Sequence, residues 1–301
     1  MQRPSVVRLG KTDLQVCRIG IGCGNGISSS DLQYAIDHGI NYVFHSTDLH
    51  HHAYAASREA IRGLFSAHST RRDDLALVTC SYICDPEKVL PVVMDTVTSL
   101  RVDHVDVFQW GWVTKRAYSQ SFLADTRDSL KSENVSAFVS EYLTITEQVE
   151  AELRQRGFAR YLGVSVHDRS LARAIASDPQ CDVLMLRYNI AHRGVEGDVF
   201  PNVGPDRPGI VAFNVAHDAQ IVLAAAPPGL PDGKHVPTYS DLYRYVLDSA
   251  FVDVVLAGPA CREHIDTAVA ALHAPPLDAR MREYLKKVGD LHAGRAAIAS
   301  G

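Results

Sequence analysis

Histidine and cysteine side chains gather around two successive apolar runs of this 301-residue chain. His45 and His50 follow the run Tyr42–Phe44, and Cys80 follows the run Leu75–Thr79. Imidazole and thiol groups can bind transition metals, transfer protons or act as nucleophiles. Nitrogen and thiolate ligands of this kind suit zinc, iron or copper, and three protein ligands leave a coordination position open for catalysis. The sequence therefore predicts a catalytic and metal-binding centre at His45, His50 and Cys80.

Other chemistry is open to the same residues. Histidine has an ordinary pKa near neutrality, so His45 or His50 could act as an acid or base without a metal, with Asp48 beside them as a further catalytic residue. Cys80 could act as a nucleophile if His45 lies close enough to activate it. In a purely structural alternative, residues 48–52 form a solvated loop and Cys80 is a small buried strand residue.

Alternating strands and helices are needed to position this centre. Short apolar, β-branched runs recur eight times, and the segments between them carry helix start and stop signals, such as Ser30-Asp31 before a segment that ends at Gly39. Strand alternating with helix indicates parallel pairing, and eight strands that are apolar on both faces favour a closed barrel. The eight runs are Arg18–Gly22, Tyr42–Phe44, Leu75–Thr79, His104–Gln109, Tyr161–Val166, Asp182–Leu186, Gly209–Phe213 and Asp253–Ala257.

The predicted fold is thus α/β, a (β/α)₈ TIM barrel. Residues 5–16, turning at 11–13, are predicted to form an N-terminal β-hairpin that closes the bottom of the barrel. We expect a single domain over residues 1–301, with two connections longer than compact domains normally have, 112–143 and 218–237. Each is a candidate lid or substrate-binding loop, and 112–143 is equally consistent with a surface insertion.

The composition limits which classes of partner the chain can be expected to bind. Lys and Arg number 30 against 35 Asp and Glu, so the net charge of -5 offers no basic stripe for nucleic acid and no polybasic anchor for a membrane. We expect a small-molecule substrate. The chain has no apolar run long enough for a signal peptide or a membrane span, and six dispersed cysteines are typical of reduced thiols, so we expect a cytoplasmic protein. Oligomeric state leaves no signature in the sequence.

Five segments resemble the aldo-keto reductase superfamily in their order and spacing, from the hairpin to the last barrel helix. Residues Arg187–Gly194 are similar to a bacterial branch of that superfamily. The resemblance implies a barrel that reduces carbonyls with NADPH, using an aspartate, a tyrosine acid, a lysine that lowers the tyrosine pKa and a histidine that orients the carbonyl. The five segments are Arg8–Thr12, Gly39–Tyr42, Tyr161–Ser165, Arg187–Asn189 and Gly258–Ile265.

None of the four catalytic residues that the resemblance implies stands at its expected position. After a one-residue insertion in the second strand, the aspartate falls on His45 and the tyrosine on His50. The lysine falls on Cys80 and the orienting histidine on Gly111. Because these four positions converge at the carboxyl mouth of the family's barrel, the resemblance implies that His45 and His50 face Cys80 there. Because the proton donor and the group that orients the carbonyl are both replaced, we expect a reaction other than ordinary carbonyl reduction.

The resemblance also implies a cofactor site, which is only partly kept. Ser165, Phe213, Gly258 and Arg262 retain some capacity to bind a dinucleotide, through ring stacking and through a helix N-terminus for phosphate. Met185 replaces a glutamine that holds the nicotinamide carboxamide, so NADP binding is doubtful. The substrate-pocket residues that we predict are Trp110, Trp112, His167, Met185, Phe213 and His217.

Three functions are consistent with these residues. The leading hypothesis is a non-redox step on a small molecule, of lyase, dehydratase or isomerase type, assisted by a metal at His45, His50 and Cys80. The first alternative is an NADP-dependent carbonyl oxidoreductase that uses His50 as its acid. The second alternative is a non-catalytic binding protein of the same fold.

Overall fold

The computed structural model describes residues 6–46, 51–67, 72–82, 86–111, 147, 149–216 and 237–299. The expected lid, 112–143, and nearly all of the long loop 218–237 lie outside the described residues. So do four predicted site residues, Asp48, His50, Trp112 and His217.

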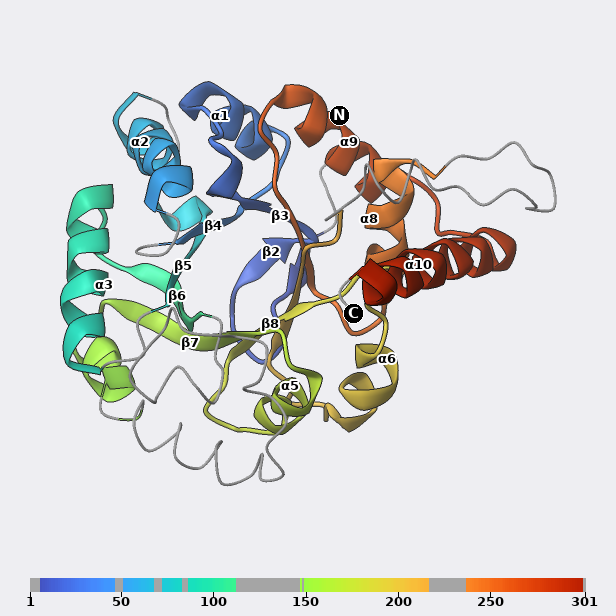
Figure 1. Cartoon of the computed structure of the whole chain (residues 1–301). Helices are drawn as coiled ribbons and strands as arrows, with labels where there is room; N and C mark the ends of the chain where they lie inside the picture. The colour runs from blue at the N-terminus through green and yellow to red at the C-terminus, as the bar shows by residue number, and fades with distance from the viewer. Residues whose placement is uncertain are drawn as a thin grey trace.

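Eight parallel strands close into one barrel, which confirms the predicted fold class (Figure 1). Each of the eight apolar runs supplies one strand, and the strands pair in the order β10-β3-β4-β5-β6-β7-β8-β9. In Figure 1 the helices form a ring around these strands. The strands are β3 (Ile19–Gly22), β4 (Tyr42–Ser46), β5 (Ala76–Ser81), β6 (Val105–Trp110), β7 (Ala159–Val166), β8 (Val183–Arg187), β9 (Gly209–Phe213) and β10 (Val254–Ala257).

The predicted N-terminal hairpin is also present. Strands β1 (Val6–Arg8) and β2 (Gln15–Cys17) pair antiparallel, and Leu9 in their turn packs in the inner core of the barrel. Gly10 has a φ of +49° and lies so close to β9 that an added Cβ would meet the backbone of Gly209 at 2.2 Å. The hairpin therefore closes the amino end of the barrel, and ligand access is left to the carboxyl end.

The helices begin and end where capping chemistry requires. Ser28 caps α1, Thr238 and Asp241 form a capping box on α8, and Gly39, at a φ of +85°, follows the end of α1. No helix in the described part of the chain is long and apolar enough to cross a membrane. The helices are α1 (Ser29–Asp37), α2 (His51–Ala67), α3 (Pro86–Leu100), α5 (Arg169–Ala176), α6 (Val195–Asp198), α8 (Tyr239–Leu247), α9 (Arg262–His273) and α10 (Ala279–Ala299), with 3-10 turns η1 (Cys23–Asn25), η2 (Arg72–Asp74) and η3 (Phe200–Asn202).

Each barrel strand divides its side chains between two cores. Tyr42 and Phe44 of β4 belong to the core inside the barrel, whereas Val43 packs in the core between the barrel and the helices. The same alternation separates Cys80, inside, from Leu77, outside. Neighbouring residues of one strand therefore face different environments, which decides which of them can reach a ligand.

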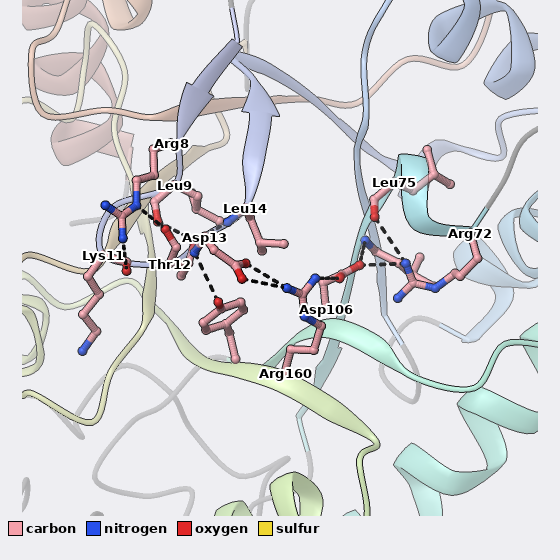
Figure 2. A network of polar contacts seen from close by, with 12 residues as sticks. Arg8, Leu9, Lys11, Thr12, Asp13, Leu14, Arg72, Leu75, Asp106 and Arg160 are labelled. Carbon is pink, nitrogen blue, oxygen red and sulfur yellow. Dashed lines mark hydrogen bonds and ion pairs between the residues drawn. The ribbon is translucent and has the colours of Figure 1, made fainter.

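Aspartates at the amino ends of alternate strands tie the barrel together. The carboxylates of Asp106, Asp182 and Asp253 each accept the backbone N–H of a residue on the preceding strand, at 2.8–3.0 Å. Each also pairs with arginine, and Figure 2 shows Asp106 between the guanidinium groups of Arg72 and Arg160. This network lies at the end of the barrel opposite the ligand-accessible mouth, so we assign it to stability.

Candidate functional site

A cavity of about 690 Å³ lies at the carboxyl ends of the barrel strands. Phe44, Ser165, Met185 and Phe213 line it from four different strands. This is the end of a (β/α)₈ barrel where active sites occur, and the volume falls in the range of small-molecule sites. The remaining lining residues are Gly22, Gly24, Asn25, Tyr54, Tyr82, His167, Asn214, Val215, Ala216, Tyr239, Tyr243, Leu256, Ala257, Gly258, His264 and Thr267.

His45 lies on the far side of the barrel wall from this cavity. Its imidazole is 1% exposed, and Nδ1 is 2.9 Å from the Ser57 hydroxyl of α2. That hydroxyl donates its proton to the Tyr54 carbonyl oxygen at 2.7 Å, so Nδ1–H of His45 is the donor to Ser57. Burial, followed by the charge of nearby Arg58, lowers the pKa of His45 to about 3. The imidazole is therefore a neutral, buried group at neutral pH.

Strand periodicity explains why the expected meeting of His45 and Cys80 does not form. The ladder between β4 and β5 is unbroken, with His45 opposite Thr79 and Ser46 opposite Cys80. Phe44 lines the cavity, so His45, the next residue, points out toward α2. Cys80 instead belongs to the inner core.

The metal centre is corrected on the same geometry. Within the described residues there is no group of three or more His, Cys, Asp or Glu side chains that could hold a metal ion. His45 and Cys80, two of the three predicted ligands, lie on opposite faces of the barrel wall. The prediction of a zinc, iron or copper site at His45, His50 and Cys80 is therefore wrong.

At Gly111, the space beside the backbone is filled by the side chains of Cys80 and Tyr82. A Cβ added at Gly111 would lie 2.4 Å from the Cys80 Sγ and 2.8 Å from the ring of Tyr82. The space that a larger side chain would occupy is thus taken by a thiol and a phenol. Tyr82 also lines the cavity, and it is not one of the predicted pocket residues.

Trp110 lies outside the barrel wall rather than in the cavity. It is buried, packs edge-on against Phe108 at 5.2 Å, and its indole N–H donates to the Glu150 carboxylate at 3.1 Å. The inward positions of β6 are Val107 and Gln109, followed just beyond the strand by Gly111.

Several predicted pocket residues do line the cavity. Ser165, His167, Met185, Phe213 and Gly258 all do so, and the rings of His167 and Phe213 meet edge-on at 5.0 Å. These residues reach the cavity because they lie toward the carboxyl ends of barrel strands or shortly after them.

Arg262, in contrast, turns toward α1. Its guanidinium lies 5.0 Å from the centre of the Tyr34 ring, and its Nε–H donates to Asp31 at 2.9 Å. Arg262, a predicted cofactor-binding residue, therefore forms an ion pair with Asp31 and is not among the residues that line the cavity.

Tyr54 is a cavity residue that sequence reasoning missed. It projects from the first turns of α2, meets Phe44 edge-on, and its hydroxyl oxygen would lie 3.0 Å from a Cβ added at Gly24. Burial, with smaller contributions from Cys80 and Cys23, raises the pKa of the phenol above its ordinary value. Its place early in α2, in the segment that follows β4 at the carboxyl end of the barrel, was the available signal.

One end of the cavity lies at the N-terminus of α9. Gly258, His264 and Thr267 line this end, and the Asn25 amide donates to the Gly258 carbonyl oxygen at 2.7 Å. The Cys261 thiol contacts the Glu263 carboxylate. Backbone N–H groups at the start of a helix form a site suited to phosphate.

The barrel with its hairpin is the fold of the aldo-keto reductases. One similar structure is AKR11C1 from Bacillus halodurans in its holo form, with a TM-score of 0.71 and 20% identity over 95% of this chain and 96% of that chain. An aldo-keto reductase from Klebsiella pneumoniae in complex with NADPH gives 0.69 and 18%, over 96% of each chain. A Klebsiella pneumoniae aldo/keto reductase in complex with NADP and acetate gives 0.66 and 19%, over 95% of each chain. No protein-family model and no curated protein matches the chain.

These comparisons correct the leading functional hypothesis. Proteins that share this barrel over nearly their whole length are reductases, and two were solved with NADPH or NADP. The prediction of a non-redox lyase, dehydratase or isomerase step is therefore wrong, and so is the doubt about NADP. The alternative oxidoreductase hypothesis fits better.

Proposed function

We propose that this chain is an NADP(H)-dependent oxidoreductase of the aldo-keto reductase superfamily that acts on the carbonyl group of a small molecule. The observation that carries the proposal is the cavity itself. It extends from Phe213, Ser165 and Met185 at the barrel mouth to the N-terminus of α9. One end therefore suits a planar ring and the other suits phosphate.

The residues present fit the phosphate end of a dinucleotide. A Cβ added at Gly258 would lie 2.8 Å from the Asn25 amide nitrogen, so the glycine is what lets the cavity-lining Asn25 side chain reach the Gly258 carbonyl oxygen. His264 accepts the Ala260 N–H through Nδ1, which leaves Nε2 as a donor on the cavity-lining imidazole. His264, Thr267 and the first amides of α9 would hold the pyrophosphate or the 2′-phosphate.

The ring end fits a nicotinamide. The Phe213 ring offers an apolar face, and the Ser165 hydroxyl is a hydrogen-bonding group on the adjoining wall. NADPH, when bound, would supply the hydride. The protein would hold the carbonyl substrate beside Phe44, Tyr54 and Tyr82 at the mouth.

A proton donor must meet the carbonyl oxygen as the hydride arrives. The Tyr54 phenol lines the cavity and carries its proton at neutral pH, and burial raises its pKa further above the ordinary value. We assign it the donor role. His50, the acid of the sequence-based alternative, lies outside the described residues and remains a second donor to be tested. Cys80 and Gly111 would then stand where relatives keep a lysine and a histidine.

A non-catalytic dinucleotide-binding protein is the second candidate. The described residues that line the cavity include no lysine and no carboxylate, so the phenol has no charged partner among them. Without a charged neighbour to ease proton transfer from the phenol, this lining favours slow turnover or none.

The chain is proposed to be a single domain over residues 1–301. The described strands and helices, from Val6 to Ala299, build one closed barrel and its helical ring. Residues 112–143 and 218–237 follow β6 and β9 in the sequence, and we propose them as a lid or as substrate-binding loops.

The test combines binding with turnover. NADPH is titrated by calorimetry, and its oxidation is followed at 340 nm with a panel of aldehydes, ketones and quinones. We expect saturable binding, turnover with at least one carbonyl class, and a loss of turnover but not of binding in Tyr54→Phe. Tyr161→Phe, whose hydroxyl accepts the Asp13 N–H at the opposite end of the barrel, is the matched control.

The results of these assays distinguish the two candidate functions and the two candidate proton donors. Binding without turnover in the wild type supports the non-catalytic candidate. Full turnover in Tyr54→Phe together with loss in His50→Gln moves the donor role to His50. Absence of binding of NADPH and of NADP⁺ refutes the proposal.

A further inference from the structure

Gln109 is a polar side chain enclosed within the barrel without a hydrogen-bond partner. It is 0% exposed, and within the described part of the chain neither its Oε1 nor its Nε2 has a partner. A primary amide offers two donors and one acceptor, and a buried amide that uses none of them is unfavourable. Such a group in a folded protein calls for a ligand or an ordered water.

The side chain of Gln109 leans across β7 toward β8. Gln109 of β6 pairs with Gly163 of β7, which pairs in turn with Val183 of β8. A Cβ added at Gly163 would lie 3.0 Å from the Gln109 Cγ and 2.5 Å from the Val183 carbonyl oxygen. The bare backbone of Gly163 is therefore what admits the glutamine side chain at this point.

Strand register relates Gln109 to the ring end of the cavity. The next inward residues on β7 and β8 are Ser165 and Met185, which pair with one another. Both line the cavity. Met185 is unbranched with three rotatable bonds, so its side chain can turn aside and connect the Gln109 amide with the cavity.

The ligand group must complement an amide. Phosphates held at the N-terminus of α9 would place the nicotinamide of a dinucleotide at the opposite end of the cavity, against Phe213 and Met185. The nicotinamide carries a carboxamide, whose two N–H donors and one carbonyl acceptor match those of Gln109 in the reverse sense.

We infer that the Gln109 amide binds the carboxamide of the nicotinamide ring, reached by displacement of the Met185 side chain, with the Ser165 hydroxyl beside it. This inference rests on the proposed function and adds a binding residue to it. A water bound permanently at Gln109 is the competing occupant.

Three ligands separate these possibilities by calorimetry. NADP⁺ carries the carboxamide, its 3-acetylpyridine analogue replaces the amide nitrogen by a methyl group, and 2′-phospho-ADP-ribose lacks the ring. Wild-type protein is expected to bind NADP⁺ about tenfold more tightly than the acetylpyridine analogue. In Gln109→Leu we expect NADP⁺ to weaken to the affinity of the analogue, with binding of 2′-phospho-ADP-ribose unchanged.

Tyr42→Phe is the matched control. Its hydroxyl is also buried without a partner in the described structure, but its ring leans over Gly20 of β3, away from β7. The discrimination between NADP⁺ and its analogue should persist in this variant. Gln109→Met, which keeps the length of the side chain, replaces Gln109→Leu if the leucine variant fails to fold.

The outcomes distinguish the two levels of the proposal. If none of the three ligands binds wild-type protein, the proposed function fails and this inference falls with it. If they bind but Gln109→Leu or Gln109→Met discriminates as wild type does, only the inference is overturned, and the amide holds an internal water. Equal wild-type affinity for NADP⁺ and its analogue overturns it as well.

Discussion

Acidification should destabilise this protein through one buried imidazole. His45 lies between the barrel wall and α2, and burial lowers its pKa to about 3 in the folded chain. In the unfolded chain the same group titrates near its ordinary value of about 6.5. Between these two values the unfolded state binds a proton that the folded state does not bind. Stability from His45 is therefore fully present above about pH 6.5 and is lost as the pH falls toward about 3.

The size of the effect follows from linkage. Each pH unit in this window lowers the free energy of unfolding by about 1.4 kcal/mol. At pH 4.5, His45 has therefore lowered it by roughly 3 kcal/mol relative to neutral pH. His45→Asn removes the titration while an amide N–H can still donate to the Ser57 hydroxyl, which now accepts from Nδ1.

Urea unfolding of both proteins at pH 7.5 and pH 4.5 provides the assay. The free energy of unfolding of the wild type should fall between the two pH values by roughly 3 kcal/mol more than that of His45→Asn. Equal falls in the two proteins would refute the reasoning, because His45 would then bind its proton in the folded chain as easily as in solvent.

Three further perturbations test other parts of the structure. Gly111→Ala should lower the free energy of unfolding by about 1–3 kcal/mol, because its Cβ would overlap the Cys80 thiol; an unchanged urea midpoint would contradict this. Asp253→Ala leaves Arg207 and the Ile210 N–H without their carboxylate and should cost about 3–5 kcal/mol, whereas a loss below about 1 kcal/mol would show that the amino-end network is dispensable. Phe213→Ala should weaken NADPH binding about tenfold by calorimetry while leaving 2′-phospho-ADP-ribose binding unchanged; equal weakening of both ligands would place the ring elsewhere.

The strands could be predicted because their apolar runs are continuous. All eight runs form barrel strands, and α1 ends just before Gly39 as expected, although Ser28 rather than the predicted Ser30-Asp31 caps its start. The same continuity hides which residues face inward. When both faces of a strand are buried, alternation of polar and apolar residues disappears, so Phe44 and His45 cannot be told apart by pattern. Trp110 was assigned to the cavity for the same reason and packs outside it.

The site was only partly predictable. Ser165, Met185 and Phe213 were found because the resemblance to the aldo-keto reductases aligns them with cofactor-binding positions, and all three line the cavity. Tyr54 and Tyr82 lie after their strands, where position depends on the path of a connecting segment rather than on periodicity. Gln109 could not be singled out, because an inward glutamine in an apolar strand looks like any other core position until its partners are known.

Calorimetric titration of NADPH into the wild-type protein tests the central claim most directly. The proposed function predicts saturable binding with one site per chain, competed by NADP⁺. Heats that never saturate with either nucleotide, in protein shown by circular dichroism to be folded, would contradict it.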